Sequence, residues 1–453
     1  VTPTETYRGS ICIKDGKIAA IAAPELECDG ACITDAAGKY VMAGFIDGHC
    51  HSRDGYEGAH YKEDFAHSSQ AGAAGGITTI LEMPNCNPTI YNADRLRDLV
   101  DCVTPKAYVD FGIWGLCLGD LNLAELAPMA QAGAIGFKFF WGYAIDSKNY
   151  QLIYNYKAGE ENVIPPPDQT QIYKMFRELA KIGKPVGIHA ENFDIIRLLT
   201  QEVTASGDRS YEAMLRSRPP VSETTVIETA ISFAKELGTR LHILHLAAGD
   251  GVELIRRAKG EGVRVTAETA PHYLTLTDRD APRLGAVIKA YPPVRRERDS
   301  EMLWDALNEG VISFVASDHA PHTAEEKAKG LWDAPAGISG IETMSSLLMD
   351  AVNKGKMTIN RLADVLSEQP ARLYGLYPRK GSLTVGADAD IVIADMNFEY
   401  TFHQEDMHSR VKLSPYDGRE LRGKPVQTIL RGRTVMRDGE IIGAPVGRFV
   451  RPE

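Results

Sequence analysis

Eight short apolar runs alternate with longer amphipathic stretches between residues 40 and 322. The runs include YVMAGFIDGHCH, AIGFKFFWG and SFVASDHAPH, and the amphipathic stretches include QIYKMFRELAKIG and GVELIRRAKGEG. Regular alternation of this kind is typical of a parallel sheet, and eight such units predict a closed (β/α)8 TIM barrel. We therefore expect an α/β protein whose main domain spans residues 44–380.

Both ends of the chain have a different pattern. Residues 8–40 and 381–449 alternate polar and apolar positions, with DG and RG turns between the alternating runs. We expect them to form one small β-sandwich domain comprising residues 1–43 and 381–453. Residues 144–167 have no helical period and contain three consecutive prolines. They predict a long loop over the barrel mouth, either a lid or specificity element or a plain surface excursion.

Composition and charge restrict the class of protein. The 453 residues are 44% hydrophobic and 25% charged, and the net charge of −11 argues against a nucleic-acid partner. No apolar run reaches the roughly 18 residues that a membrane span needs, and no signal peptide is visible. Seven cysteines all lie before residue 118 without regular spacing, which predicts a reducing, cytoplasmic setting. The chain begins with Val1 rather than methionine, so the sequence allows a short preceding segment.

Residues able to bind metals or transfer protons gather where the apolar runs end. The carboxyl ends of barrel strands form one face, and active sites occur at that face. Strand alternation directs His49 and His51 to the same side, with Arg53 beyond them. The same alternation turns His242 away from His245. The set at the strand ends is His49, His51, Asn85, Lys138, His189, His245, His272 and Asp318.

Lys138 is the most informative of these residues. It ends a central apolar strand in GFKFFWG, where desolvation lowers the pKa of a lysine and makes the neutral amine available. A neutral amine reacts with carbon dioxide to form a carbamate, an anion able to bridge two cations. Four histidines, Asp318 and such a carbamate suit two divalent ions, zinc first, with manganese, cobalt or iron as alternatives. The other interpretation is a lysine paired with Asp318 or Glu191 in a site without metal.

The motifs GFIDGHCH, GFKFF, GIHAEN, ILHL and ASDHAPHTAEEK resemble, in order and spacing, the cyclic amidohydrolase branch of the amidohydrolase superfamily. That branch contains hydantoinases or dihydropyrimidinases, dihydroorotases and allantoinases, and the resemblance covers nearly the whole chain. It implies an enzyme that opens the ring amide C–N bond of a cyclic ureide or imide with a bridging hydroxide, commonly as a homodimer or homotetramer. By this resemblance, one ion is held by His49, His51, carboxylated Lys138 and Asp318, the other by Lys138, His189 and His245, and Asp318 carries the proton.

The motifs disagree about which ring is the substrate. Arg53 and Asn85 resemble the residues with which dihydroorotases bind a substrate carboxylate, a group that suits a guanidinium. Tyr143, five residues after Lys138, resembles the tyrosine that stabilises an oxyanion in hydantoinases. By analogy, the remaining candidates for contact with the substrate are His272, Tyr291, Pro292 and His322.

Other interpretations stay open at this point. A nucleobase-type deaminase would use one metal and no bridging lysine, so Lys138 argues against that class. A non-catalytic dihydropyrimidinase-like protein would have lost its ligands, whereas all the ligand positions are filled here. Arg53 has the structural alternative of an ion pair with Asp54 or Glu82, and the histidines of the mouth have the alternative of bracing it.

Overall fold

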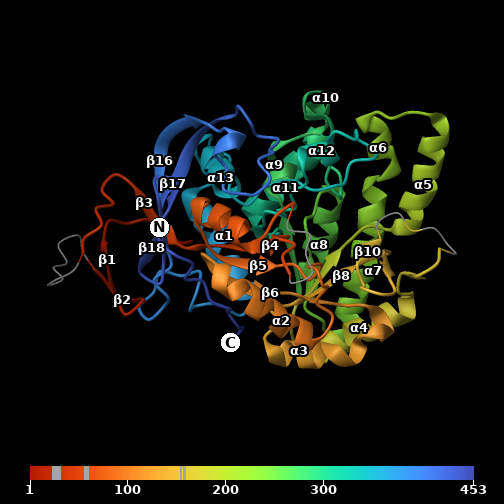
Figure 1. The fold of residues 1–453 in the computed structure, drawn as a ribbon, viewed down its shortest axis with the longest axis horizontal. Coiled ribbons are helices and arrows are strands. Elements are labelled where there is room, and N and C mark those ends of the chain that lie inside the picture. Colours follow the sequence, from red (N-terminus) through yellow and green to blue (C-terminus); the bar gives the residue numbers. More distant parts are fainter. Residues whose placement is uncertain (23–31, 56–60, 154–155, 157–159) are drawn as a thin grey trace.

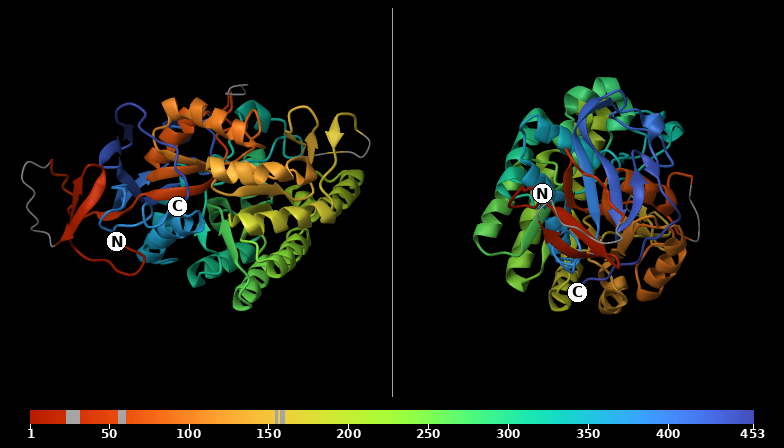
Figure 2. Two further views of the ribbon diagram at one scale, coloured as in Figure 1. Left: turned by 90° about the horizontal axis from the view of Figure 1, so that it is seen from below. Right: turned by 90° about the vertical axis from the view of Figure 1, so that its left-hand side faces the viewer.

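Helices surround a central set of parallel strands, and antiparallel strands from both ends of the chain lie to one side (Figures 1 and 2). The computed structural model describes residues 1–22, 32–55, 61–153, 156 and 160–453. The parallel strands pair in the orders β15–β14–β13–β12–β8–β7 and β4–β5–β6. Their bounds are β4 Phe45–Cys50, β5 Ile77–Glu82, β6 Asp110–Ile113, β7 Gly115–Leu116, β8 Phe137–Phe140, β12 Val186–His189, β13 Leu241–Ile243, β14 Val265–Thr269 and β15 Phe314–Val315.

Two links join these sheets. Strand β6 leads through Trp114 into β7, and the Trp114 amide donates to the Glu82 carbonyl over 3.0 Å. At the other edge, Cys50 forms a parallel bridge with His319, and the His51 amide donates to the His319 carbonyl over 2.8 Å. The segments that carry His51 and Asp318 are therefore neighbours, although they are far apart in the sequence.

The flanking helices follow from amphipathic sequence and capping residues. Helix α4 (Gln169–Ile182) begins where Asp168 accepts a hydrogen bond from the Gln171 amide, and it ends at Gly183 with a left-handed φ of 76°. Its buried face is Ile172, Met175, Phe176 and Leu179. The other long helices are α1 Phe65–Ala74, α2 Ala93–Val103, α5 Phe193–Ser206, α7 Pro220–Leu237, α8 Asp250–Gly260, α11 Glu297–Glu309 and α13 Met344–Asn353.

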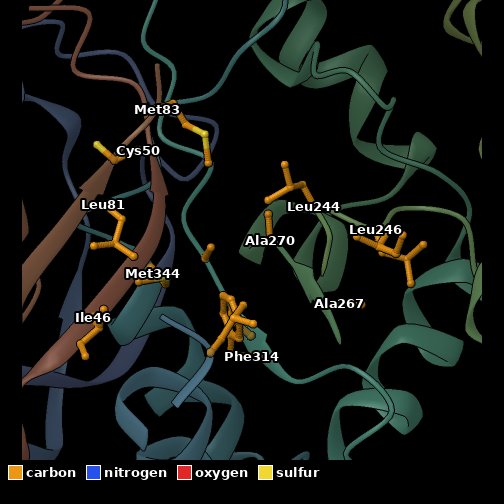
Figure 3. Packing of buried hydrophobic residues seen from close by; sticks show 14 of the residues in the cluster. Ile46, Cys50, Leu81, Met83, Leu244, Leu246, Ala267, Ala270, Phe314 and Met344 are labelled. Carbon is orange, nitrogen blue, oxygen red and sulfur yellow. The ribbon is translucent and has the colours of Figure 1, made fainter. Parts of the chain in front are cut away.

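Apolar side chains fill the space between the strands and helices (Figure 3). Leu81 on β5 and Met344 on α13 are fully buried members of this core. None of the helices in the described part of the chain has the length and apolar character that crossing a membrane requires.

Both ends of the chain contribute to the antiparallel part of the molecule. Five strands pair in the order β19–β18–β17–β16–β3, so a strand from the N-terminal region lies beside C-terminal strands. A separate β1–β2 hairpin contacts them where the Ile18 amide donates to the Ala387 carbonyl over 3.0 Å. The bounds are β1 Ser10–Lys14, β2 Lys17–Ala22, β3 Tyr40–Ala43, β16 Ile391–Thr401, β17 Glu420–Leu430, β18 Arg433–Arg437 and β19 Glu440–Ile441.

The segment at 144–167 contains more regular structure than the sequence predicted. Three short antiparallel strands, β9 (Ala144–Asp146), β10 (Leu152–Ile153) and β11 (Val163–Ile164), pair in the order β10–β9–β11. The prediction of an irregular loop was wrong for these strands, because their apolar residues pack with Phe140 and Tyr143. Residues 154, 155 and 157–159 lie outside the described residues.

A buried lysine joins the terminal strands to the parallel sheet. The Nζ atom of Lys380 lies 2.7 Å from Asp110 on β6 and 2.6 Å from Asp390, just before β16. Burial acts to lower the pKa of Lys380, but Asp390, Asp110 and Asp388 outweigh burial and raise it. This ammonium therefore stays charged and neutralises several buried carboxylates.

Replacing Lys380 by methionine should lower the free energy of unfolding by about 3–5 kcal/mol, because the change removes the cation that pairs with buried Asp390. Lys17 offers a matched control, since it pairs with Asp388 over 2.7 Å but its side chain is 47% exposed. Lys17→Met should cost only about 0–1 kcal/mol. Thermal or denaturant unfolding measures both values, and equal losses would contradict a special role for Lys380.

Candidate metal centre

Two histidines and an aspartate converge at the ends of β4 and β15. His49 Nε2 lies 3.3 Å from Asp318 Oδ1, and His51 Nε2 lies 3.5 Å from the same oxygen. The two histidine Nε2 atoms are 3.1 Å apart. Each residue thus offers one ligand atom within 4.8 Å of the other two. Imidazole nitrogens and a carboxylate oxygen at this spacing suit a divalent metal ion.

Oxygen acceptors behind the two imidazoles determine which nitrogen faces Asp318. His49 Nδ1 lies 2.6 Å from Glu268 Oε1, and His51 Nδ1 lies 2.7 Å from Asn85 Oδ1. Both acceptors favour a proton on Nδ1, so the Nε2 lone pairs are directed toward Asp318. Asn85, a candidate for substrate binding from the sequence, therefore contacts a histidine of the site.

A second pair of histidines faces the first. His189 Nδ1 lies 3.0 Å from His245 Nε2, and the His49 and His245 ring centroids are 5.3 Å apart. Glu191 Oε2 lies 2.9 Å from His189 Nε2 and holds a proton there, which leaves Nδ1 as the donor atom for a metal. His245 and Asp318 have left-handed φ values of 38° and 46°, a strained conformation that is concentrated at functional sites.

His242 does not turn away from the interior as alternation predicted. Its ring stacks on Phe314 with centroids 5.1 Å apart, and its Nε2 lies 3.1 Å from Glu268 Oε2. The alternation fails because β13 ends at Ile243 and His245 has a left-handed backbone. His242 therefore supports Glu268, which in turn holds His49.

Lys138 lies in β8 and faces the same interior. It is 1% exposed, and its Nζ lies 4.6 Å from the Phe140 ring centroid. Across the described ranges, no carboxylate oxygen lies within 4.0 Å of this nitrogen, so the ion pairs that the sequence left open are not formed there. Burial lowers the pKa of Lys138 to about 8, although Asp318 and Glu268 act in the opposite direction. Its neutral amine is therefore populated near neutral pH.

The surrounding groups have the charges that metal ligands require. Burial, followed by the Lys138 charge, lowers the pKa of His49 to about 3. Burial likewise lowers the pKa of His189 and of His245. For Asp318, burial acts to raise the pKa, but His49 and the neighbouring histidines outweigh it and lower the pKa well below its usual value. At neutral pH the site therefore presents neutral imidazoles and an ionised carboxylate.

Arg53 follows β4 and contacts Glu82 and His322. Its backbone has a left-handed φ of 56°, and its amide donates to Glu82 Oε1 over 3.2 Å. The guanidinium Nη2 lies 3.2 Å from His322 Nε2. Lys62 Nζ lies 3.2 Å from the other ring nitrogen of His322. Two cationic side chains thus meet at one histidine, which gives this edge of the site a positive charge.

The remaining candidates from the sequence have different surroundings. Tyr143 is 3% exposed, and its hydroxyl oxygen lies 3.3 Å from His189 Nε2. The His272 ring packs on Tyr273, whose hydroxyl donates to the Pro292 carbonyl over 2.8 Å. His272 Nε2 has no hydrogen-bond partner among the described residues. Tyr291 packs under an arginine, Arg218, which the sequence did not single out.

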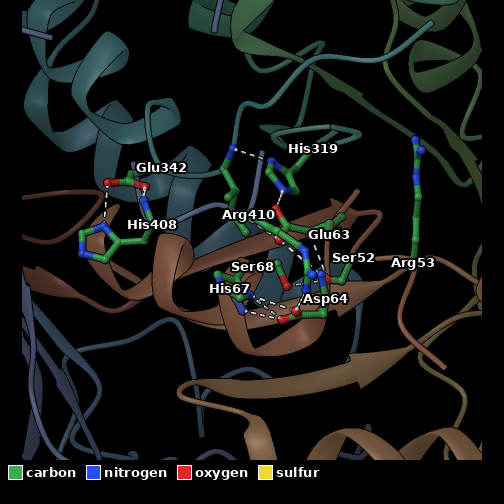
Figure 4. A network of polar contacts seen from close by, with 12 residues as sticks. Ser52, Arg53, Glu63, Asp64, His67, Ser68, His319, Glu342, His408 and Arg410 are labelled. Atoms are coloured by element: carbon green, nitrogen blue, oxygen red, sulfur yellow. Dashed lines mark hydrogen bonds and ion pairs between the residues drawn. The ribbon is translucent and has the colours of Figure 1, made fainter. Parts of the chain in front are cut away.

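Several acidic residues of the site were also missed from the sequence. Glu268 lies within ETAPHYL and supports His49, while Glu63 holds the residue after Asp318. Glu63 Oε2 lies 3.1 Å from His319 Nε2, and Glu63 Oε1 accepts a hydrogen bond from the Arg410 amide (Figure 4). Glu268 lies within the predicted run RVTAETAPHYL, whereas Glu63 lies outside the predicted runs and had no signal in the sequence. Their partners come from distant segments and do not follow from spacing.

An apolar cavity of about 440 Å³ has Phe140 and Tyr143 in its wall, and the inserted strands contribute Ile145, Leu152 and Ile164. Phe140 and Tyr143 also contact His189. The 144–167 segment therefore borders a cavity that shares two wall residues with the surroundings of His189.

Comparison with known proteins identifies related sequences and structures. The amidohydrolase family model matches residues 40–435. The chain is 36% identical to an L-hydantoinase of Paenarthrobacter aurescens over 445 residues, covering 97% of this chain and 93% of that protein. It is 37% identical to an allantoinase of Rubrobacter xylanophilus over 444 residues, covering 97% and 93% of the two proteins.

Solved structures give the same relationship. The structure of L-hydantoinase (dihydropyrimidinase) from Arthrobacter aurescens matches with a TM-score of 0.92 at 35% identity, covering 100% of this chain and 97% of that one. A D-hydantoinase structure matches with a TM-score of 0.89 at 31% identity, again covering 100% and 97%.

Proposed function

Because this chain belongs to the amidohydrolase family, with hydantoinases and allantoinases among its relatives, we propose that it opens the ring amide C–N bond of a five- or six-membered cyclic ureide or imide. One observation carries the proposal. Two opposed groups of ligand atoms, His49, His51 and Asp318 on one side and His189 and His245 on the other, surround a buried lysine without a carboxylate partner in the described residues.

We further infer that the parallel strands close into a (β/α)8 barrel over residues 44–380. Continuous pairing from β7 to β15, the passage of β6 into β7 and the Cys50–His319 bridge support closure. The antiparallel strands would form the β-sandwich of residues 1–43 and 381–453, with homodimers or homotetramers as the expected assembly.

Two divalent ions fit this donor set, with zinc as the first candidate. The imidazoles are neutral, so each keeps one unprotonated nitrogen, and the aspartate is ionised, as metal ligands must be. When bound, the ions supply a Lewis acid for the ring carbonyl and a nucleophile at neutral pH. The residues that would hold the ions are His49, His51, Lys138, His189, His245 and Asp318.

Lys138 would take part as a carbamate. Its neutral amine attacks carbon dioxide, an N–C bond forms as one C=O π pair moves to oxygen, and the nitrogen gives its proton to water. The product is an anion with two oxygens, which would compensate for the positive charge of the two ions. The low pKa of Lys138, about 8, supports this step because the neutral amine is the reactive form.

Side chains of this protein would direct the proton and the developing charge. Asp318, ionised beside His49 and His51, accepts the proton of the attacking water and delivers it to the departing ring nitrogen. The Tyr143 hydroxyl donates a hydrogen bond to the ring oxygen as negative charge develops there. The ring C–N bond then breaks and leaves an open-chain carbamoyl or amide acid.

The cavity beside Tyr143 bears on the choice of ring. Most of its lining is apolar, so a polar ureido substituent, as in allantoin, would lose hydrogen bonds with water there. A hydantoin with an apolar substituent at its fifth ring position would lose none. We therefore expect such hydantoins to be better substrates than allantoin.

The first experiment measures turnover and metal content in the same zinc- or manganese-loaded sample. The rings are hydantoin, 5-substituted hydantoins, dihydrouracil, allantoin and dihydroorotate. Opening of at least one ring, with about two ions per chain, is the expected result. No turnover of any ring by fully loaded protein would contradict the proposed function.

The Arg53→Ala variant should affect turnover of a ring that carries a carboxylate more than turnover of an uncharged ring. A guanidinium bound to a substrate carboxylate contributes about 1.5–3 kcal/mol, so the variant should lower kcat/KM for dihydroorotate by about 10–100-fold. Uncharged hydantoins should change little. Lys62→Ala is the matched control, because Lys62 is a neighbouring cation at His322 that already pairs with Glu326 over 2.8 Å. Equal losses on both kinds of ring would contradict a carboxylate site at Arg53.

A further inference from the structure

The residues on either side of Asp318 are each held by a buried carboxylate. Ser317 donates to Asp47 through both its amide and its hydroxyl. His319 lies against Glu63, with its Nε2 atom 3.1 Å from Glu63 Oε2. Asp318 itself has a left-handed φ of 46°, which a residue other than glycine keeps only where its surroundings hold it. The position of Asp318 therefore depends on what holds its two neighbours.

The proton of His319 lies on the nitrogen that faces Glu63. His319 Nδ1 accepts a hydrogen bond from the Gly340 amide over 3.2 Å, so in the neutral ring this nitrogen carries no proton. The proton is then on Nε2, which donates to Glu63 Oε2. Both side chains are fully buried, so no water replaces this bond when it is broken. Glu63 thus fixes the orientation of the His319 ring.

The other oxygen of Glu63 contacts the C-terminal part of the chain. Glu63 Oε1 accepts hydrogen bonds from the Arg410 amide over 3.1 Å and from the Asp64 amide over 3.2 Å. The Arg410 Nη1 atom donates to Asp64 Oδ2 over 2.9 Å. Arg410 therefore contacts, through its backbone and its side chain, the two residues that precede helix α1 (Figure 4).

A second glutamate holds residues 408–410 from another side. Glu342 Oε2 accepts a hydrogen bond from the His408 amide over 2.8 Å, and Glu342 Oε1 lies 3.0 Å from His408 Nδ1. Glu342 precedes helix α13 by two residues, so this contact comes from a different part of the molecule than Glu63. Between the two contacts, Ser409 is only 1% exposed. Residues 408–410 are thus fixed at both ends.

We propose that residues 408–410 position Asp318, acting through Glu63 and His319. This inference rests on the proposed ring-opening function, in which Asp318 carries the proton. Neither Glu63 nor Arg410 needs to contact the substrate, so both are positioning residues. A misplacement of about 1 Å at a reacting group lowers the rate by about 100-fold. Loss of these contacts should therefore lower kcat more than it raises KM.

Arg410→Pro tests the contact between the Arg410 amide and Glu63, because proline has no N–H to donate. Arg410→Ala is the matched reference, since it keeps the amide and removes only the guanidinium. The Arg410 side chain is 42% exposed, so neither change empties the core. On the best ring substrate, kcat of Arg410→Pro should be about tenfold below that of Arg410→Ala. KM and metal content should differ between the two variants by less than about twofold.

A double-mutant cycle with Glu63→Gln tests whether both residues act through one contact. Glutamine has nearly the same size, but its amide nitrogen only donates, so it cannot accept from both His319 and the Arg410 amide. Glu63→Gln alone should lower kcat by about 10–100-fold. With Glu63→Gln present, Arg410→Pro and Arg410→Ala should differ by less than about twofold, because the contact is already broken.

Glu342→Gln replaces Arg410→Pro in the cycle if the proline variant does not fold. Glutamine at this position cannot accept from both the His408 amide and the His408 ring, so residues 408–410 lose one of their fixed ends. Glu342 has no contact with Glu63 or His319 in the described residues. The variant should lower kcat at least about threefold in the wild type and less than about 1.5-fold when Glu63→Gln is present.

The two proposals fail in different ways. Wild-type protein that opens no ring contradicts the proposed function. Wild-type turnover with equal kcat in Arg410→Pro and Arg410→Ala overturns the positioning role alone, and so does a difference that persists with Glu63→Gln. A fall in metal content large enough to explain the lower kcat overturns it as well. For Glu342→Gln, an unchanged kcat or an effect that multiplies with that of Glu63→Gln has the same meaning.

Discussion

Replacement of Lys138 by alanine should lower turnover at least about a thousandfold, equivalent to roughly 4 kcal/mol of lost transition-state stabilisation. The side chain is buried between the two groups of histidines, where a carbamate would compensate for two cations. Without that anion, metal ions placed so close together would repel each other. We therefore expect the alanine variant to retain less than its full complement of metal.

Four measurements on Lys138→Ala separate this explanation from simple unfolding. Metal content should fall while the thermal midpoint falls little, and added short carboxylic acids should restore part of the activity by occupying the vacated space. The mass of the intact native protein should exceed that of its sequence by one carbon dioxide, and the variant should lack this excess. Lys380→Met serves as the control, since it should lower stability and leave metal content intact. Full metal content and activity in Lys138→Ala would refute the bridging carbamate.

Asp318→Asn should lower kcat by about 100- to 10,000-fold, the range for loss of a general acid–base group. The amide has nearly the same shape as the carboxylate and still offers an oxygen to a metal, but it cannot accept and return a proton. Rings whose departing nitrogen is a better leaving group need less protonation. They should therefore lose less activity than rings with a poor leaving group.

Glu63→Gln is the matched control for Asp318→Asn. Glu63 contacts His319, the residue after Asp318, so the variant disturbs the same segment without removing the proton carrier. It should lower activity by about 10–100-fold at most, with no dependence on the leaving group. If Asp318→Asn shows the same uniform loss on every ring, Asp318 acts as a metal ligand alone.

The ligand residues could be predicted from sequence because each lies at the end of an apolar run. His49 and Lys138 lie within the last residues of β4 and β8, and Asp318 follows the end of β15 by three residues. Periodicity places such residues on one face of a parallel sheet without knowledge of any tertiary contact.

Contacts between distant segments could not be predicted in this way. Arg218 lies between helices, outside every apolar run, and meets Glu191 only after the chain has folded. His242 was assigned to the wrong side because alternation assumes an extended backbone, whereas His245 is left-handed. The strands of the inserted segment were missed because they are very short and depend on packing against Phe140 and Tyr143.

The hydrogen bond between the His51 amide and the His319 carbonyl joins the first and last parallel strands of the chain. His49 and Asp318 belong to the same two segments and lie close to each other beside this hydrogen bond. A metal ion bound between His49 and Asp318 would stabilise the pairing of these two segments. By linkage, the pairing would strengthen ion binding by the same free energy. Loss of metal would then weaken this pairing as well as stop ring opening. Metal supply would therefore regulate the lifetime of the folded protein as well as its activity.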